Sequence, residues 1–255
     1  MDVVAIYQLS GSTEELARNL AAALGVTAYE ARPRVNIPGG GPAVVASFAA
    51  SAQAQECAAR LNAAGFKTLV LQPEEVETDA NRLLVRSIHF CPDALKFTSH
   101  TGQQADLPYS EVSLLLRGAG IITQVEVEQH TKKKFSPGRA VATGGLMMRR
   151  KVRTVTTSTS QERQPFCHVY AAGHPPMVLR QADMDYSSLG DNLQLSQDAN
   201  FSWICAELRR RCTAARWDER LQTRPGLAQV LGAAFDPERY LDLAISLIAR
   251  AEDKR

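Results

Sequence analysis

The stretch LLVRSIHFCPDALKFTSHTGQQADL, residues 83–107, decides the fold of the larger part of the chain. It contains short runs rich in apolar and β-branched residues, and the breaks between them hold Pro92, Asp93 and Gly102, which are typical of turns. A further run of the same kind follows Pro108. This rhythm predicts an antiparallel β-meander with strands over residues 83–90, 94–98, 104–107 and 111–117.

Two more strands and a helix are expected C-terminal to the meander. Residues 166–171 and 177–180 have the composition of strands, and they flank a turn over residues 172–176. The helix is predicted because apolar residues recur at helical spacing after Asn200. These residues are Phe201, Ile204, Cys205, Leu208 and Cys212.

The rhythm of the meander resembles the opening sheet of bacterial pleckstrin-homology-like domains. The resemblance depends on Pro92-Asp93-Ala94-Leu95, on Gly102 and on residues 107–112. It implies that residues 82–222 form a β-barrel closed by one helix. Members of this fold bind lipids, peptides or other proteins through variable loops, so the resemblance implies binding without naming a ligand.

Residues 1–75 alternate between strand and helix patterns. A buried strand is expected over residues 3–7, and Ser12 with Glu15 matches a capping box that starts a helix, which Gly25 ends. Strands are then expected over residues 26–35, 43–48 and 67–71, with a second helix over residues 51–64. The order βαββαβ is that of the ferredoxin-like fold. The fold class predicted for the chain is therefore α+β.

Two families with the ferredoxin-like fold are similar to parts of this region. Residues 45–49, followed by Ala54, Ala58 and Leu61, resemble half of a SPOR domain, which implies peptidoglycan binding and would require export. Residues 6–9 and 13–16 resemble the opening of an RNA-recognition motif, which would stack bases on aromatic side chains. Only two aromatic residues are candidates for such stacking, so RNA binding is not assigned. They are Tyr7 and Phe48.

The remaining segments are an acidic connector and a helical tail. Acidic residues from Glu74 to Asp79 mark a boundary, and residues 76–81 are expected to connect the two domains. In the tail, residues 223–255, Asp236 is expected to cap a helix that begins at Pro237. Its apolar stripe could dock on either domain or on a second copy of the chain. The stripe consists of Leu241, Ala244, Ile245 and Ile248.

The strongest charge anomaly is a basic insertion, residues 123–164. It holds eight cations over about twenty residues, and no acid occurs between Gln129 and Gln161. Two interpretations stay open: a solvated hairpin or insertion, or a site at which cations hold phosphates by releasing counterions. The anion-binding candidates are Lys132, Lys133, Lys134, Arg149, Arg150 and Lys151.

Catalytic and metal-binding patterns are not found. Cys167 and His168 are adjacent on a predicted strand and would point to opposite faces, so they could not share a zinc ion. The known catalytic spacings, the dinucleotide fingerprint and the Walker pattern are missing, and no cofactor is expected. An active site assembled from distant loops would escape such a search.

Charge balance, cysteine content and the N-terminal sequence bear on the location and the function of the protein. The 29 Lys and Arg residues nearly balance the 27 Asp and Glu residues, so any electrostatic function is local. Five scattered cysteines and an N-terminus that does not resemble a signal peptide favour the cytoplasm. We expect a non-catalytic binding or regulatory protein whose partner is another protein or a second copy. The alternatives are a binder of nucleotide or nucleic acid that uses the basic insertion, and an enzyme of unrecognised type.

Overall fold

The structure, a computed structural model, describes the backbone of residues 1–135 and 149–254, and side chains within residues 1–120 and 163–254. Contacts between residues divide the chain into two compact units. Unit 1 comprises Met1–Gly120 and Gln164–Arg255, and unit 2 comprises Ile121–Arg163. Helices and sheets are mixed in one chain, so the predicted α+β class is confirmed. Among the described helices, none has the length and apolar composition needed to cross a bilayer.

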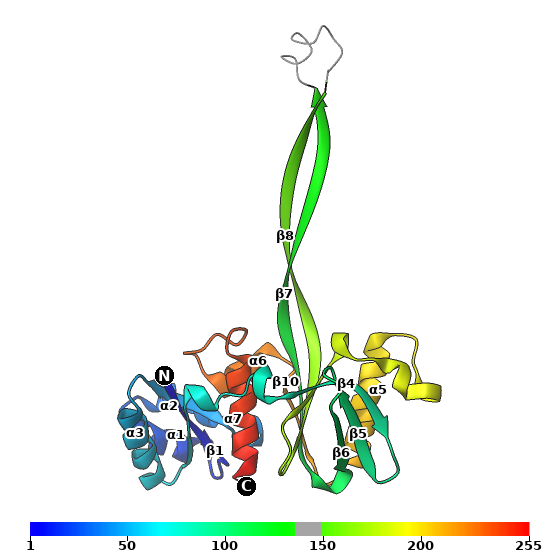
Figure 1. The fold of residues 1–255 in the computed structure, drawn as a ribbon. Helices are drawn as coiled ribbons and strands as arrows, with labels where there is room; N and C mark the ends of the chain where they lie inside the picture. Colours follow the sequence, from blue (N-terminus) through cyan, green and yellow to red (C-terminus); the bar gives the residue numbers. More distant parts are fainter. Residues whose placement is uncertain (136–148, 255) are drawn as a thin grey trace. The chain divides into compact units, whose positions relative to one another are not determined.

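The N-terminal part of unit 1 is a three-stranded antiparallel sheet covered by three helices (Figure 1). The strand order is β2-β1-β3, with the first strand of the chain at the centre. Alternate residues of β1 face opposite sides of the sheet, and those facing the helices include Val4 and Ile6. The elements are β1 (Asp2–Tyr7), α1 (Thr13–Leu24), α2 (Ala28–Val35), β2 (Ala43–Phe48), α3 (Ser51–Ala63) and β3 (Lys67–Leu71).

The strand predicted over residues 26–35 is wrong, because this segment forms the helix α2. Thr27 accepts a hydrogen bond from the Glu30 backbone N–H, and the Glu30 carboxylate accepts one from the Thr27 backbone N–H at 2.9 Å. This reciprocal capping box satisfies amide donors that a new helix leaves free. The order is therefore βααβαβ with three strands, and the predicted ferredoxin-like order of four strands is not formed.

The second sheet of unit 1 has the order β10-β7-β8-β9-β4-β5-β6. The first three strands of the predicted four-strand meander are confirmed, since β4, β5 and β6 pair antiparallel as neighbours. The fourth was predicted wrongly as the next neighbour, because residues 112–117 belong to β7, which lies between β10 and β8. The sheet is mixed, because β10 pairs parallel with β7 and β9 pairs parallel with β4. Its strands are β4 (Leu83–Phe90), β5 (Ala94–Ser99), β6 (Gln104–Pro108), β7 (Val112–Phe135), β8 (Arg149–Ala171), β9 (Met177–Arg180) and β10 (Arg216–Leu221).

This sheet is open, so the predicted closed pleckstrin-homology-like barrel is not formed. The outer strands β10 and β6 each have a single neighbour among the described strands. Both faces of the sheet pack against helices, and the sheet therefore need not curl on itself to bury one face. On one face lies the helix predicted from the spacing of residues 201–212, which is confirmed as α5 (Gln197–Arg211).

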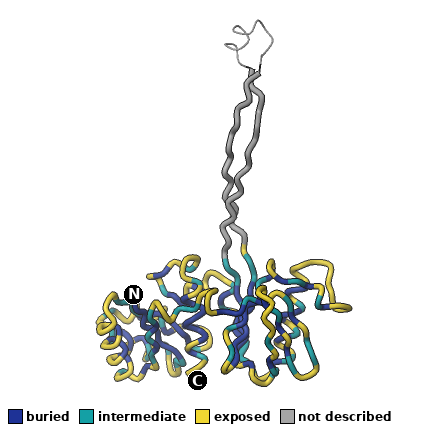
Figure 2. Tube along the Cα trace, viewed as in Figure 1, coloured by how far each residue is buried: buried dark blue, intermediate teal, exposed yellow. Residues whose placement is uncertain are grey.

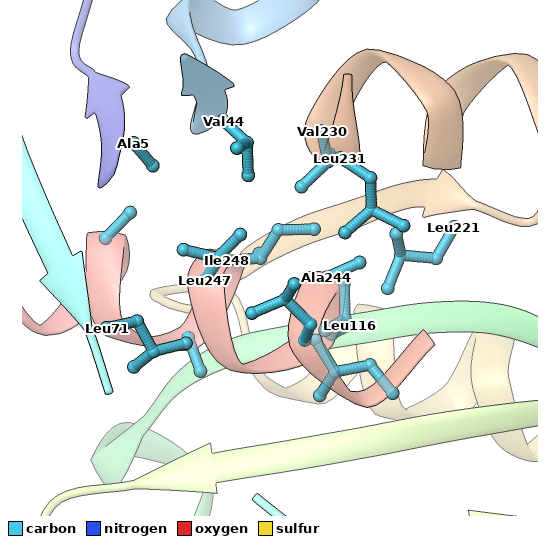
Figure 3. Packing of buried hydrophobic residues seen from close by; sticks show 14 of the residues in the cluster. Ala5, Val44, Leu71, Leu116, Leu221, Val230, Leu231, Ala244, Leu247 and Ile248 are labelled. Carbon is cyan, nitrogen blue, oxygen red and sulfur yellow. The ribbon is translucent and has the colours of Figure 1, made fainter. Parts of the chain in front are cut away.

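The opposite face packs on a helix that also contacts the N-terminal sheet. This helix, α7 (Leu241–Asp253), buries eight of its 13 residues, since apolar neighbours lie on more than one side of it. Figure 3 shows its side chains between Ala5 and Leu71 of the first sheet and Leu116 of the second. α7 starts four residues after the predicted Pro237, and α6 (Arg224–Leu231) precedes it. Figure 2 shows the resulting buried interior of unit 1.

Candidate functional site

The six predicted anion-binding residues lie in unit 2. Lys132, Lys133 and Lys134 fall in β7, and Arg149, Arg150 and Lys151 fall in β8. Their side chains lie outside the described residues, and they are placed by the backbone and the sequence alone. The two strands have 24 and 23 residues, several times the usual strand length, and they are neighbours in the sheet.

Contacts at the unit 1 end of β7 and β8 show that the two strands are antiparallel. Ser113 Oγ donates a hydrogen bond to the Tyr170 carbonyl at 3.3 Å, and farther along β7 the backbone of Gly118 lies against the Phe166 ring. The residue number therefore rises in β7 as it falls in β8. Carried along both strands, this pairing sets residues 132–134 across from roughly residues 149–152. The two basic runs, distant in sequence, meet at the same end of the strand pair.

The charge of the chain is unevenly divided between the units. Of the 29 Lys and Arg residues, nine occur within residues 121–163, but only three of the 27 Asp and Glu residues do. The rest of the chain therefore holds 20 cations against 24 acids. A formal net charge near zero conceals a strongly basic unit 2 and a mildly acidic unit 1.

Unit 1 contains a cleft of about 710 Å³, where the acidic connector, the end of β8 and the end of α7 come together. Its lining includes Glu77, Tyr170, His174 and Arg250. Acidic side chains dominate the charged groups in the lining. Nothing in the sequence places these segments together, because the connector and α7 are more than 160 residues apart.

A hydrogen-bonded network of titratable groups begins at the wall of this cleft. The Tyr170 hydroxyl donates to Glu77 Oε2 at 2.9 Å, and His168 Nδ1 lies 3.3 Å from the same hydroxyl. A tyrosine has one hydroxyl hydrogen, and when the Tyr170 hydroxyl donates it to Glu77, a bond to His168 requires the tautomer whose proton is on Nδ1.

Burial shifts the pKa of each group in this network in the direction that favours its uncharged form. The pKa of Glu77 is raised by burial, which the Tyr170 hydrogen bond and the Arg82 charge offset only in part. Burial, and then the Glu77 carboxylate, raise the pKa of Tyr170 well above 10. Burial, followed by the charges on Arg82 and Arg180, lowers the pKa of His168 well below 6.5. At neutral pH, His168 is therefore neutral and Tyr170 is protonated.

Arg82 connects this hydrogen-bonded network to α7. Its side chain is 2% exposed, and its Nη1 donates to Asp242 Oδ1 at 2.7 Å, while its Nε lies 3.5 Å from Glu77 Oε2. The Glu77 backbone N–H donates to Ser246 Oγ of α7 at 2.8 Å. Most of these polar groups have a partner in the described part of the chain. The network therefore holds the connector, β8 and α7 together, and we interpret it as structural.

Sequence reasoning missed this network. His168 and Tyr170 are two residues apart on a strand and share a face, so their proximity was predictable. Their partner Glu77 was interpreted only as part of a connector. Cys167, on the opposite face, packs in the core beside α5. No group of three or more His, Cys, Asp or Glu side chains suited to a metal ion occurs among the residues whose side chains are described.

Comparisons with known protein families, with curated proteins and with solved structures gave no match for this chain.

Proposed function

We propose that the protein is a non-catalytic binding protein that holds a phosphate-rich polymer through the basic strands of unit 2. The observation that supports this proposal most directly is the antiparallel pairing of β7 and β8, which brings two runs of three cations to one end of the strand pair. The uneven distribution of charge between the units adds to it. Cations clustered in this way bind a polyanion by displacing its condensed counterions.

The cellular location and the absence of catalysis belong to the same proposal. All five cysteines are free thiols, which suits a reducing compartment such as the cytoplasm. Beside the unit 1 cleft, Tyr170 bonds to both Glu77 and His168, and Arg82 bonds to Asp242 of α7; we take these bonds as support for a scaffold over a reaction centre. A protein partner or a second copy of the chain is the competing occupant of the basic strands.

The test is a titration of the full chain with a fluorescently labelled heparin fragment and a labelled oligonucleotide at low salt. In the variant, all six candidate cations become Gln. The matched control removes six exposed cations of unit 1, so both variants change the net charge equally. The control positions are Arg18, Arg60, Arg86, Arg224, Arg239 and Lys254.

We expect the unit 2 variant to lose at least about 100-fold in affinity for both probes, because each lost phosphate contact removes a counterion-release contribution. The control variant should stay within about threefold of the wild type, since its cations lie outside the proposed contact. Equal losses in the two variants would show that only net charge matters and would contradict the proposal. Unchanged binding in the unit 2 variant would do the same.

A further inference from the structure

We propose that two copies of this chain associate through β7, with the two β7 strands paired antiparallel about His130. The surface involved is one edge of residues 121–135, whose backbone the structure describes. The inference goes beyond the proposed function and does not depend on it. It predicts a dimer that forms in the absence of any polyanion.

One edge of β7 has no neighbouring strand beyond Gly118 among the described strands. The pairing of β10 with β7 ends at Leu221 and Gly118, and β9 pairs with β8 only over residues 166–169. Within unit 2, the strands β7 and β8 therefore have only each other among the strands that the structure describes. A two-stranded ribbon is marginally stable in water, and the free N–H and C=O groups of its edge can pair with a further strand. A strand added at this edge would therefore stabilise unit 2.

The charges of β7 are segregated along the strand. Residues 126–134 read EVEQHTKKK, with two acids at the start and three lysines at the end. The acids Glu126 and Glu128 and the cations Lys132 and Lys134 are even numbers of residues apart, so all four belong to one face of the strand. A parallel copy in register would set acid across from acid and lysine across from lysine. An antiparallel copy sets the acids across from the lysines, so β7 is complementary to itself.

One antiparallel register uses all four of these positions. When His130 lies across from His130 of the second copy, Glu128 is across from Lys132 and Glu126 is across from Lys134. The two-fold symmetry of such a dimer repeats both pairs, which gives four pairs of opposite charge. A shift by two residues in either direction keeps each residue on its face but leaves two such pairs. Because opposite charges across two strands stabilise their pairing, the charges favour the register centred on His130.

The edge of β8 does not have this complementarity. Residues 149–163 hold five cations and a single acid, Glu162. A register that sets Glu162 across from Arg150 also sets Arg149 across from Arg163, so that like charges oppose one another. The cations of β8 therefore lie outside the pairing, and a polyanion can still bind the paired chains through them.

The experiment measures the oligomeric state of the full chain by analytical ultracentrifugation over a range of protein concentrations, with no polyanion present. We expect the wild type to form a dimer. Its dissociation constant should rise at least about tenfold in E126K/E128K and in K132E/K134E, because each change sets like charges across from one another. The control R149E/K151E changes the net charge as K132E/K134E does but lies in β8, and it should dimerise as the wild type does.

A charge swap separates the register from net charge. The variant E126K/E128K/K132E/K134E restores opposite charges at every pair and has the net charge of the wild type, so it should dimerise again. An equimolar mixture of E126K/E128K and K132E/K134E should form a heterodimer, since one chain then has lysine at all four positions and the other has glutamate. Equal melting temperatures would confirm that the variants fold.

Three results would overturn the inference. They are a wild type that is monomeric at every concentration, a charge-swapped variant that does not dimerise, and a control that loses as much as K132E/K134E. Because the measurement contains no polyanion, none of these results decides the proposed function, which the heparin and oligonucleotide titrations test separately.

Discussion

Replacing Leu247 with Ala tests the architecture, because this side chain of α7 lies in the core shared by the two sheets of unit 1. Leu247 is fully buried, and its cluster includes Leu71 of the first sheet and Leu116 of the second (Figure 3). Removing a fully buried leucine side chain loses about 2 to 3 kcal/mol of transfer free energy. A cavity that neighbours cannot fill adds to this, so we expect a loss of about 3 to 5 kcal/mol in the free energy of unfolding.

The assay is urea unfolding followed by circular dichroism, with hydrogen exchange to locate the effect. Leu195, which is fully exposed, provides the matched control, and Leu195→Ala should change stability by less than about 0.5 kcal/mol. Because α7 contacts both sheets, amides of β1 and of the first residues of β7 should lose protection together in Leu247→Ala. A loss below about 1 kcal/mol, or lost protection in one sheet alone, would refute the shared core.

Three further predictions concern the polar network and backbone packing. Tyr170→Phe removes the donor to the half-buried Glu77 carboxylate and should cost about 1 to 3 kcal/mol of unfolding free energy, with an effect that shrinks when Glu77 is already Gln. The pKa of His168 is lowered by burial, so the unfolded chain binds its proton more tightly, and wild-type stability should fall as the pH drops below 6.5. His168→Gln should flatten that fall in urea midpoints measured between pH 7.5 and 5.5, and an unchanged slope would contradict the assignment. In Gly226→Ala, the new Cβ would lie 2.0 Å from the Arg220 carbonyl oxygen. We therefore expect the free energy of unfolding, measured by thermal unfolding, to fall by about 1 to 3 kcal/mol. A neutral effect would disprove the close packing.

Much of the local structure was predictable because it depends on short-range patterns. The strand over residues 83–90 and the helix α1, with Ser12 as its cap and Gly25 as its end, follow from alternation, capping and turn chemistry. The helix α2 was missed although Thr27 and Glu30 form a capping box, because the apolar pattern of residues 26–35 was interpreted at the period of a strand.

What could not be predicted depends on contacts between distant segments. β10 is amphipathic only in part and pairs with β7, about one hundred residues earlier in the chain, so its sequence alone did not mark it as a strand. The polar network joins Glu77, Tyr170 and Asp242 across 165 residues of sequence. The basic runs were visible in the sequence, but their meeting at one end of a strand pair required the antiparallel order of β7 and β8.

The most direct test of the proposed binding of a phosphate-rich polymer is its salt dependence, with an oligonucleotide as the probe. The affinity of the full chain for a duplex oligonucleotide is measured at several salt concentrations between 50 and 200 mM, and its logarithm is plotted against the logarithm of the salt concentration. If six cations contact phosphates, the slope should be near −5, and the affinity should fall by about 10³-fold over this range. A slope near zero, or one that is unchanged when Lys132, Lys133 and Lys134 become Gln, would contradict the account.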